Sequence, residues 1–139
     1  MIRLFVFVAL LPITAHAVEP VNRYLLTDVR VADGDTVTAD VQLGYGVTLE
    51  DERIRFTGFD AWEASYARRT VKVTPDEIER GKAATAYLRE LLRTGRIYIT
   101  PGREHRDHYG RLLGAAIVVQ DGRVSRLADL MRQGGHCRD

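Results

Sequence analysis

The sequence predicts a mainly β protein with helices, an α+β fold of five strands with one helix inserted after the third strand and a short helix near the C-terminal end. Three observations support this fold class. Apolar and β-branched residues alternate through five short segments. A single longer segment has apolar residues at helical spacing behind a capping sequence. The chain is long enough for one hydrophobic core and too short for two.

The first two strands are predicted at 24–31 and 36–43, on either side of a tight turn at D33-G34. G44-Y-G46 then reverses the chain into a third strand at 47–58, with a polar interruption at 50–52. Two further strands are predicted at 96–100 and 112–119. Five such strands suit a small, partly open barrel of the oligonucleotide/oligosaccharide-binding (OB) type, although a five-stranded sandwich would give much the same pattern.

Capping signals define both predicted helices. T74-P-D-E77 is a capping box with proline at the first helical position, and the helix is expected to end near Gly95. Its apolar residues recur at helical spacing: Ala84, Tyr87, Leu88, Leu91 and Leu92. After a turn at D121-G122, a last helix is predicted at 125–133, ended by Gly134.

The N-terminal segment is typical of an export signal. An apolar run at 4–13 follows Arg3 and leads to A15-H-A17, a small-x-small pattern that signal peptidase cleaves. A membrane helix would need about 20 apolar residues, and this run is shorter and contains Pro12. We therefore expect a signal peptide at 1–17 and a single domain at 18–139, secreted or periplasmic, with no membrane anchor after cleavage.

The balance of charges and the single cysteine limit which binding partners and which oligomeric states we expect. Removal of 1–17 takes away Arg3 and leaves 19 basic and 19 acidic residues, so a generally basic surface for nucleic acid is absent. Nearly all the basic residues are arginines, which suit bidentate phosphate contacts, so any anion site must be local. The lone Cys137 excludes an internal disulfide: we expect a monomer with a free thiol, or else a dimer linked through Cys137.

The stretch I54-R-F-T-G-F-D-A-W-E63 places charges beside the predicted core. Ile54 and Phe56 share one face of a strand, whereas Arg55, Asp60 and Glu63 lie on its other face or beyond its end. Ionised groups are costly to desolvate unless they are paired or bind a metal, so such clusters often indicate a functional site. The structural alternative is a salt bridge between Arg55 and Glu63.

Three segments in order resemble the staphylococcal nuclease (thermonuclease) family: A32-D-G-D-T36, I54-R-F-T-G-F-D-A-W-E63 and D107-H-Y-G-R111. The resemblance covers about residues 24–135. It implies a barrel nuclease that hydrolyses DNA and RNA with calcium, cleaving the bond to the 5′ oxygen and leaving a 3′-phosphate. The main alternative is a nucleic-acid-binding barrel that has lost catalysis. An oligosaccharide- or protein-binding barrel would also explain the fold, but not the family's charged residues.

The resemblance implies a calcium site made by the carboxylates of Asp35 and Asp60 and the backbone carbonyl of Ala61. Calcium takes six to eight hard oxygen ligands, so this set leaves positions for water and a substrate phosphate. On its own, Asp35 could instead be a hairpin-turn aspartate. Asp33 could equally be that turn residue.

The same resemblance implies a catalytic trio of Arg55, Glu63 and Arg111. In this interpretation Glu63 positions or deprotonates the attacking water, and the two arginines bind the phosphate and stabilise the transition state. The alternative for Arg111 is a place on a solvated turn. Tyr109 is implied as a substrate contact, because the family has a tyrosine there.

Two departures from the family pattern bear on the site. Trp62 stands where a proline often precedes the glutamate, and Ala61 where a hydroxyl residue is usual. Trp62 could stack on a base of the substrate or pack against the core. After Gly135 only four residues follow, so we expect the family's third helix and its stacking tyrosines to be missing and substrate affinity to be lower.

Arginines crowd the turn before Arg111. Arg103 and Arg106 precede it, and with the basic residues Arg68, Arg69 and Lys72 they predict a local rim for phosphate contacts, with Arg106 as a substrate-binding residue. The alternative is a set of ordinary exposed arginines. H105-R-D-H108 has residues that could bind zinc, but no third ligand follows at a suitable spacing.

Overall fold

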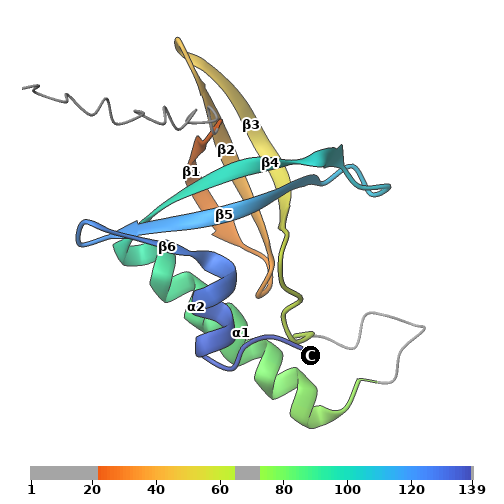
Figure 1. Cartoon of the computed structure of the whole chain (residues 1–139). Helices are drawn as coiled ribbons and strands as arrows, with labels where there is room; N and C mark the ends of the chain where they lie inside the picture. Colours follow the sequence, from red (N-terminus) through yellow and green to blue (C-terminus); the bar gives the residue numbers. More distant parts are fainter. Residues whose placement is uncertain (1–21, 65–72, 139) are drawn as a thin grey trace, which may run out of the picture.

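The computed structural model describes residues 22–64 and 73–138, which form one barrel with two helices beside it (Figure 1). The elements in chain order are β1 (Tyr24–Val31), β2 (Thr36–Gly44), β3 (Val47–Phe56), α1 (Pro75–Thr94), β4 (Arg96–Arg106), β5 (Leu112–Gln120), β6 (Arg123–Arg126) and α2 (Leu127–Gln133). The predicted α+β order is confirmed, with the longer helix after the third strand.

One sheet wraps into the barrel. Its strand order is β3-β2-β1-β4-β5-β6, and β3 also pairs with β5 in parallel, which closes five of the strands on themselves. Every other pairing is antiparallel. The closed five-stranded barrel agrees with the predicted OB-type fold and not with a sandwich.

The C-terminal part differs from the prediction at two places. Strand β6 takes residues that were assigned to the last helix, because Ser125 and Arg126 pair with β5, and α2 begins only at Leu127. Strand β4 runs six residues further than predicted, to Arg106, which pairs with Leu112. Both differences arise from strand pairing between distant segments, which local propensity does not encode.

The predicted polar interruption in the third strand is a bulge. Asp51 has a φ of 54°, and the register between β2 and β3 shifts between Ala39 and Val41. The Asp51 amide donates a hydrogen bond of 2.9 Å to the Asp40 carboxylate across the bulge. The strand therefore bends without ending.

The barrel interior and one face of α1 form the core. Fully buried residues include Val37, Ile54, Phe56, Leu88 and Val118. Helix α1 lies across one end of the barrel (Figure 1). Its start has the predicted capping box, because the Thr74 hydroxyl accepts from the Glu77 amide and the Glu77 carboxylate accepts from the Thr74 amide.

In the described part of the chain, no helix has the length and apolar character needed to cross a membrane. The predicted signal peptide at 1–17 lies outside the described residues, so the expected export stays a prediction.

Candidate active site

The parallel pairing of β3 and β5 places two arginines on one face. Arg55 pairs with Leu113, and Arg111 lies two residues before Leu113. Paired residues share a face, so Arg55 and Leu113 point to the same side; Arg111 lies directly before the first residue of β5, where continued alternation puts it on that side too. Their neighbours Ile54 and Phe56 point the other way and are fully buried in the core. The two arginines therefore lie on the outside of the barrel, at the end where β3 leaves it.

Arg55 joins two carboxylates from different parts of the chain. Its Nη2 lies 3.7 Å from Asp35 Oδ2 and also bonds to Asp60 Oδ1. Asp35 follows the turn between β1 and β2 and is 9% exposed, whereas Asp60 lies in the loop after β3 and is largely exposed. The two carboxylates thus converge on a single cationic nitrogen that is buried on one side and open to solvent on the other.

The surroundings of Asp35 favour a positive partner for its carboxylate. Its carboxylate accepts hydrogen bonds from the Thr36 hydroxyl at 2.9 Å and from the Ala61 amide at 3.3 Å. Burial and the nearby charge of Asp33 raise the pKa of Asp35, while Arg55 and the Thr36 bond oppose that rise. Desolvation disfavours the anion, so a cation beside it stabilises the ionised form.

Asp33 is the turn residue of the β1–β2 hairpin. Its Oδ1 accepts a hydrogen bond of 3.1 Å from the Asp35 amide, the geometry of an aspartate that caps its own turn. Asp35 does not cap the turn, and its carboxylate instead contacts the Arg55 guanidinium and the Ala61 amide.

The oxygen atoms at this site suit a hard cation. Asp35 and Asp60 supply two carboxylates, and the bridge between Ala61 and Cys137 uses the Asp60 carbonyl and the Trp62 amide, so it does not consume the Ala61 carbonyl. Within 22–64 and 73–138, no three His, Cys, Asp or Glu side chains gather into a complete metal centre. A calcium ion here would complete its shell with water and phosphate oxygens, which its high coordination number allows.

Arg111 is held by an aspartate four residues before it. Its Nε donates to Asp107 Oδ2 at 2.8 Å, while Asp107 Oδ1 accepts from the amides of Tyr109 and Arg111. The side chains of Arg111 and Asp107 are 12% and 14% exposed. Burial raises the pKa of Asp107, but these hydrogen bonds and the Arg111 charge outweigh it and hold the pKa below its usual range. Sequence reasoning gave Asp107 no role, although its spacing from Arg111 was an available signal.

Arg106 is bound to the barrel. Its two terminal nitrogens donate to the Glu52 carboxylate at 2.9 and 2.7 Å, and Nη1 also donates to the Gly110 carbonyl at 2.7 Å. This bidentate pair attaches the turn between β4 and β5 to β3. Glu52 is far from Arg106 in the sequence, so no local pattern indicated the contact. In this conformation the predicted substrate-binding arginine supports the turn that carries Tyr109 and Arg111.

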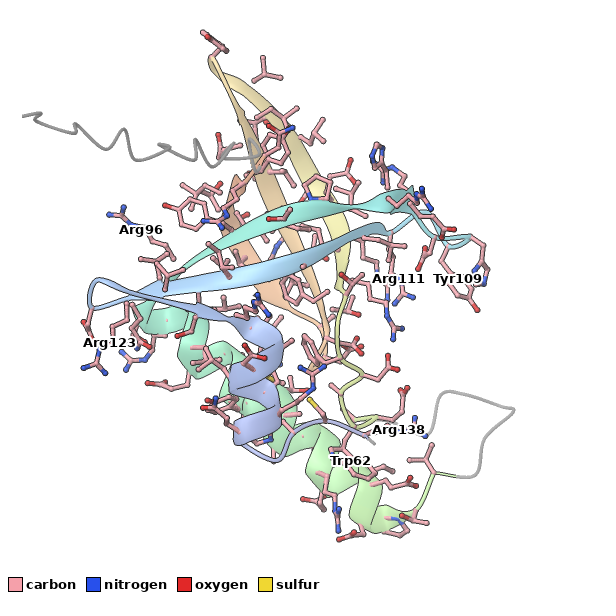
Figure 2. All side chains as sticks on the ribbon, in the orientation of Figure 1. Trp62, Arg96, Tyr109, Arg111, Arg123 and Arg138 are labelled. Atoms are coloured by element: carbon pink, nitrogen blue, oxygen red, sulfur yellow. The ribbon has the colours of Figure 1, made fainter. Side chains whose placement is uncertain are left out.

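Tyr109 projects from that turn into solvent. Its side chain is among the most exposed large apolar groups, at 71%, and the Arg111 guanidinium lies 5.5 Å from the ring centroid (Figure 2). An exposed ring beside an arginine is an arrangement that can stack on a planar ligand.

The loop after β3 is held by α1 and by the C-terminal segment. The Trp62 ring lies against the Arg80 guanidinium of α1, 4.9 Å from its centroid (Figure 2). The half-buried Glu63 has its backbone against Gly81, where a Cβ would overlap the Glu63 carbonyl. From the other side, the Trp62 amide donates to the His136 carbonyl and the Arg138 amide to the Asp60 carbonyl. Sequence reasoning missed this double attachment.

The structure thus brings Arg55, Asp35 and Asp60 together and puts Arg111 on the same face as Arg55. Trp62 and Arg106 contact other partners, on α1 and β3. Of the predicted basic rim, Arg68, Arg69 and Lys72 lie outside the described residues, while Arg103 is exposed on β4.

The described residues thus form an OB-type barrel with Arg55 and Arg111 near one end and the carboxylates of Asp35 and Asp60 converging on Arg55. No protein-family model matches the chain. The chain is 32% identical over 106 residues to Endonuclease YhcR of Bacillus subtilis (strain 168), covering 76% of this chain. It is 36% identical over 84 residues to Thermonuclease of Staphylococcus intermedius, covering 60% of this chain. These matches and the fold place the chain in a staphylococcal-nuclease-like family.

The matched regions are parts of longer proteins. They span 8% of Endonuclease YhcR and 43% of Thermonuclease. The similarity therefore applies to this barrel and not to the whole length of either relative.

Replacement of Gly81 tests the contact between α1 and the loop that carries Glu63. Glycine to alanine inside a helix usually stabilises a protein by about 1 kcal/mol. In Gly81→Ala the new Cβ would overlap backbone atoms of Glu63, so we expect lower thermal stability and displacement of the loop. Calorimetric unfolding measures the first effect. As a control, Ala83→Gly on the exposed face should lose about 1 kcal/mol by propensity alone. A more stable Gly81→Ala variant would contradict this packing.

The Asp107 carboxylate should contribute stability only where it is ionised. Its pKa is depressed in the folded state, so the contribution is present above the unfolded pKa of about 4 and is lost as the pH falls through the folded value. We expect Asp107→Asn to lower the urea midpoint at pH 7 and to match the wild type in strong acid. Asp121→Asn, in an exposed turn, is the control. If Asp107→Asn lowered the urea midpoint equally at pH 7 and in strong acid, the charge of Asp107 would not contribute to stability.

Proposed function

We propose that the chain is an exported, calcium-dependent nuclease that hydrolyses phosphodiester bonds of DNA and RNA. The observation that carries the proposal is the placement of Arg55 and Arg111 on one outward face beside the converging carboxylates of Asp35 and Asp60. The names of the two relatives, an endonuclease and a thermonuclease, support the same reaction class.

The proposed reaction needs an activated water and positive charge on the phosphate. Glu63 positions the water in line with the leaving 5′ oxygen and accepts its proton. Arg55 and Arg111 donate paired hydrogen bonds to the phosphoryl oxygens, where negative charge increases in the transition state. The bond from phosphorus to the 5′ oxygen breaks, that oxygen takes up a proton, and the phosphate stays on the 3′ side. Tyr109 contacts the neighbouring nucleotide.

Asp35, Asp60 and the Ala61 carbonyl would hold the calcium ion. When bound, the ion supplies positive charge to a phosphate oxygen. Asp35 and Asp60 would then have a counter-ion other than Arg55, whose guanidinium becomes available to the phosphate. The buried Asp35, with its raised pKa, supports a cation at this position.

Export and a monomeric state belong to the same proposal. The sequence of 1–17 supports removal of a signal peptide and release to the periplasm or the medium. Cys137 is half-buried and packs against the core, which supports a monomer over a dimer linked through this thiol.

The competing function is a nucleic-acid-binding barrel without catalysis. It would bind phosphate through Arg55 and Arg111 but would need neither Glu63 nor the two carboxylates. A nuclease gives each of these side chains a role, and for that reason we propose catalysis.

A cleavage assay tests the proposal directly. Mature protein is incubated with plasmid DNA and with single-stranded DNA and RNA, in calcium or in chelator, and we expect cleavage only with calcium. Glu63→Gln keeps the side-chain shape and removes the base, so kcat should fall by about 10²- to 10⁴-fold while substrate affinity is kept. Glu79→Gln, on the exposed face of α1, is the matched control. Absence of cleavage in every condition would favour the binding barrel.

A separate binding measurement tests the proposed calcium site. Asp35→Asn should weaken calcium binding in titration calorimetry and slow turnover, because it removes one charged ligand while asparagine is well tolerated near a turn. Asp28→Asn changes an exposed aspartate outside the site and should leave calcium affinity unchanged. Equal calcium affinity in wild type and Asp35→Asn would remove Asp35 from the site.

A further inference from the structure

The outward face of β5 leads away from the two arginines of the candidate active site. At alternate positions after Arg111 it carries Leu113, Ala115, Ile117 and Val119. The residues between them include Ala116 and Val118, which are buried in the core. One strand face therefore connects Arg111 with the far end of the sheet.

The neighbouring strands widen this face. In one row across the sheet Tyr98 pairs with Ile117 and Ile117 with Arg126; in the next, Arg96 pairs with Val119 and Val119 with Val124. Paired residues share a face. The outer stripe, as we name it, comprises Arg96, Tyr98, Thr100, Leu113, Ala115, Ile117, Val119, Val124 and Arg126. None of these residues is acidic, so the stripe combines arginine, tyrosine and aliphatic side chains.

The far end of the stripe is exposed and cationic. Arg96 and Arg126 are exposed, and Val124 is 61% exposed. Figure 2 shows Arg96 on the side of the sheet away from the helices and Arg123, one residue before Val124, on the side of the helices. The two faces of the sheet at this end thus carry different arginines, Arg96 of β4 on one and Arg123 of β6 on the other.

A cleft adjoins this end of the stripe. Where β1 and β4 diverge, a cleft of about 600 Å³ is lined by Arg89 and Arg93 of α1 and by Arg96. Arg93 is paired with Glu90, and Asp28 also lines the cleft, so Arg89 and Arg96 are its main cationic groups. Arg96 therefore belongs both to the stripe and to the wall of this cleft.

The chemistry of the stripe suits single-stranded nucleic acid. Arginine side chains neutralise backbone phosphates, while an aromatic ring and aliphatic groups on an open sheet contact unpaired bases. From Arg111 to Val119 there are eight steps of about 3.3 Å, or about 26 Å. At about 3.4 Å per stacked nucleotide, only a strand of roughly eight nucleotides would cover this length.

We infer that a single strand bound at Arg55 and Arg111 continues along the outer stripe to Arg96 and Arg126. The inference rests on the proposed function, because it takes Arg55 and Arg111 as the place where the substrate binds. It adds the substrate class, which is long single-stranded nucleic acid. Short oligonucleotides reach only the candidate active site, whereas long ones gain contacts along β5.

Two arginines of β6 provide a matched test by binding. Arg126→Glu reverses a charge on the stripe, and Arg123→Glu makes the same change on the opposite face. Fluorescence anisotropy with a labelled 16-nucleotide single strand, in chelator to prevent turnover, should show roughly tenfold weaker binding for Arg126→Glu and a salt slope that is shallower by about 0.7. Arg96→Glu should behave in the same way. Arg123→Glu should match the wild type.

The second measurement is cleavage as a function of substrate length. With calcium, Arg126→Glu should lower kcat/KM for the 16-nucleotide strand and leave kcat/KM for a tetranucleotide unchanged. Tyr98→Leu, which keeps an apolar side chain in the sheet and removes the ring, should show the same dependence on length. Circular dichroism checks that each variant is folded.

Several outcomes would overturn the inference. Equal losses in Arg123→Glu and Arg126→Glu would show a general charge effect, and equal losses on both substrate lengths would place the effect at the candidate active site. If sedimentation showed a dimer that Arg126→Glu dissociates, the stripe would bind a second copy of the chain. If the protein cleaved nothing but bound the 16-nucleotide strand through the stripe, the proposed function would be wrong and this inference would stand.

Discussion

The parallel pairing of β3 with β5 is the constraint on which the rest of the structure depends. It closes the barrel through three residue pairs, Ile54 with Leu112, Arg55 with Leu113 and Phe56 with Gly114. Gly114, the last residue of this pairing on β5, also lets β4 approach closely, because a Cβ there would overlap Ile99 and the Thr100 carbonyl of β4. The same register turns Ile54 and Phe56 into the core and Arg55 outward beside Arg111. Barrel closure and the position of the candidate active site therefore have one cause.

Tertiary contacts hold the loop that carries Glu63. Residue 62 is a tryptophan, so no proline fixes the φ angle of the backbone before Glu63. The loop is instead held between α1, through Gly81 and the contact of Arg80 with Trp62, and the C-terminal segment, through the bridge of Ala61 with Cys137. His136 of that segment stacks on Tyr87 of α1, with ring centroids 4.5 Å apart. Because the segment is attached to both, it couples α1 to the loop.

The charges near the candidate active site act through individual pairs of neighbouring side chains and not through a net charge of the chain. Residues 18–139 have no formal net charge, yet three arginines near the candidate active site are each held by a carboxylate: Arg55 by Asp60, Arg106 by Glu52 and Arg111 by Asp107. An arginine oriented in this way loses less conformational entropy when it binds phosphate. The outer stripe is different, because none of the residues that define it is acidic, and there the substrate itself would neutralise Arg96 and Arg126.

The sequence by itself determined the local features. It predicted the β1–β2 hairpin, the capping box at Thr74 and the order of the elements, because turn residues, caps and side-chain periodicity act over a few residues. It also indicated Arg55, Asp35 and Asp60 as one site, through short segments that resemble a known family. The structure brings these three side chains together, whereas their proposed roles in catalysis and metal binding still depend on the experiments above.

Only the tertiary structure decided between barrel and sandwich, because both use the same alternation within strands and differ in which distant strands pair. The same reason explains why Ser125 and Arg126 of β6 were predicted as helix and why the Glu52 partner of Arg106 was missed. It also explains the outer stripe: Arg96, Arg123 and Arg126 are alike in sequence, and strand register alone puts Arg96 and Arg126 on one face and Arg123 on the other. Pairing between distant strands is set by closure of the whole sheet, and no short segment contains that information.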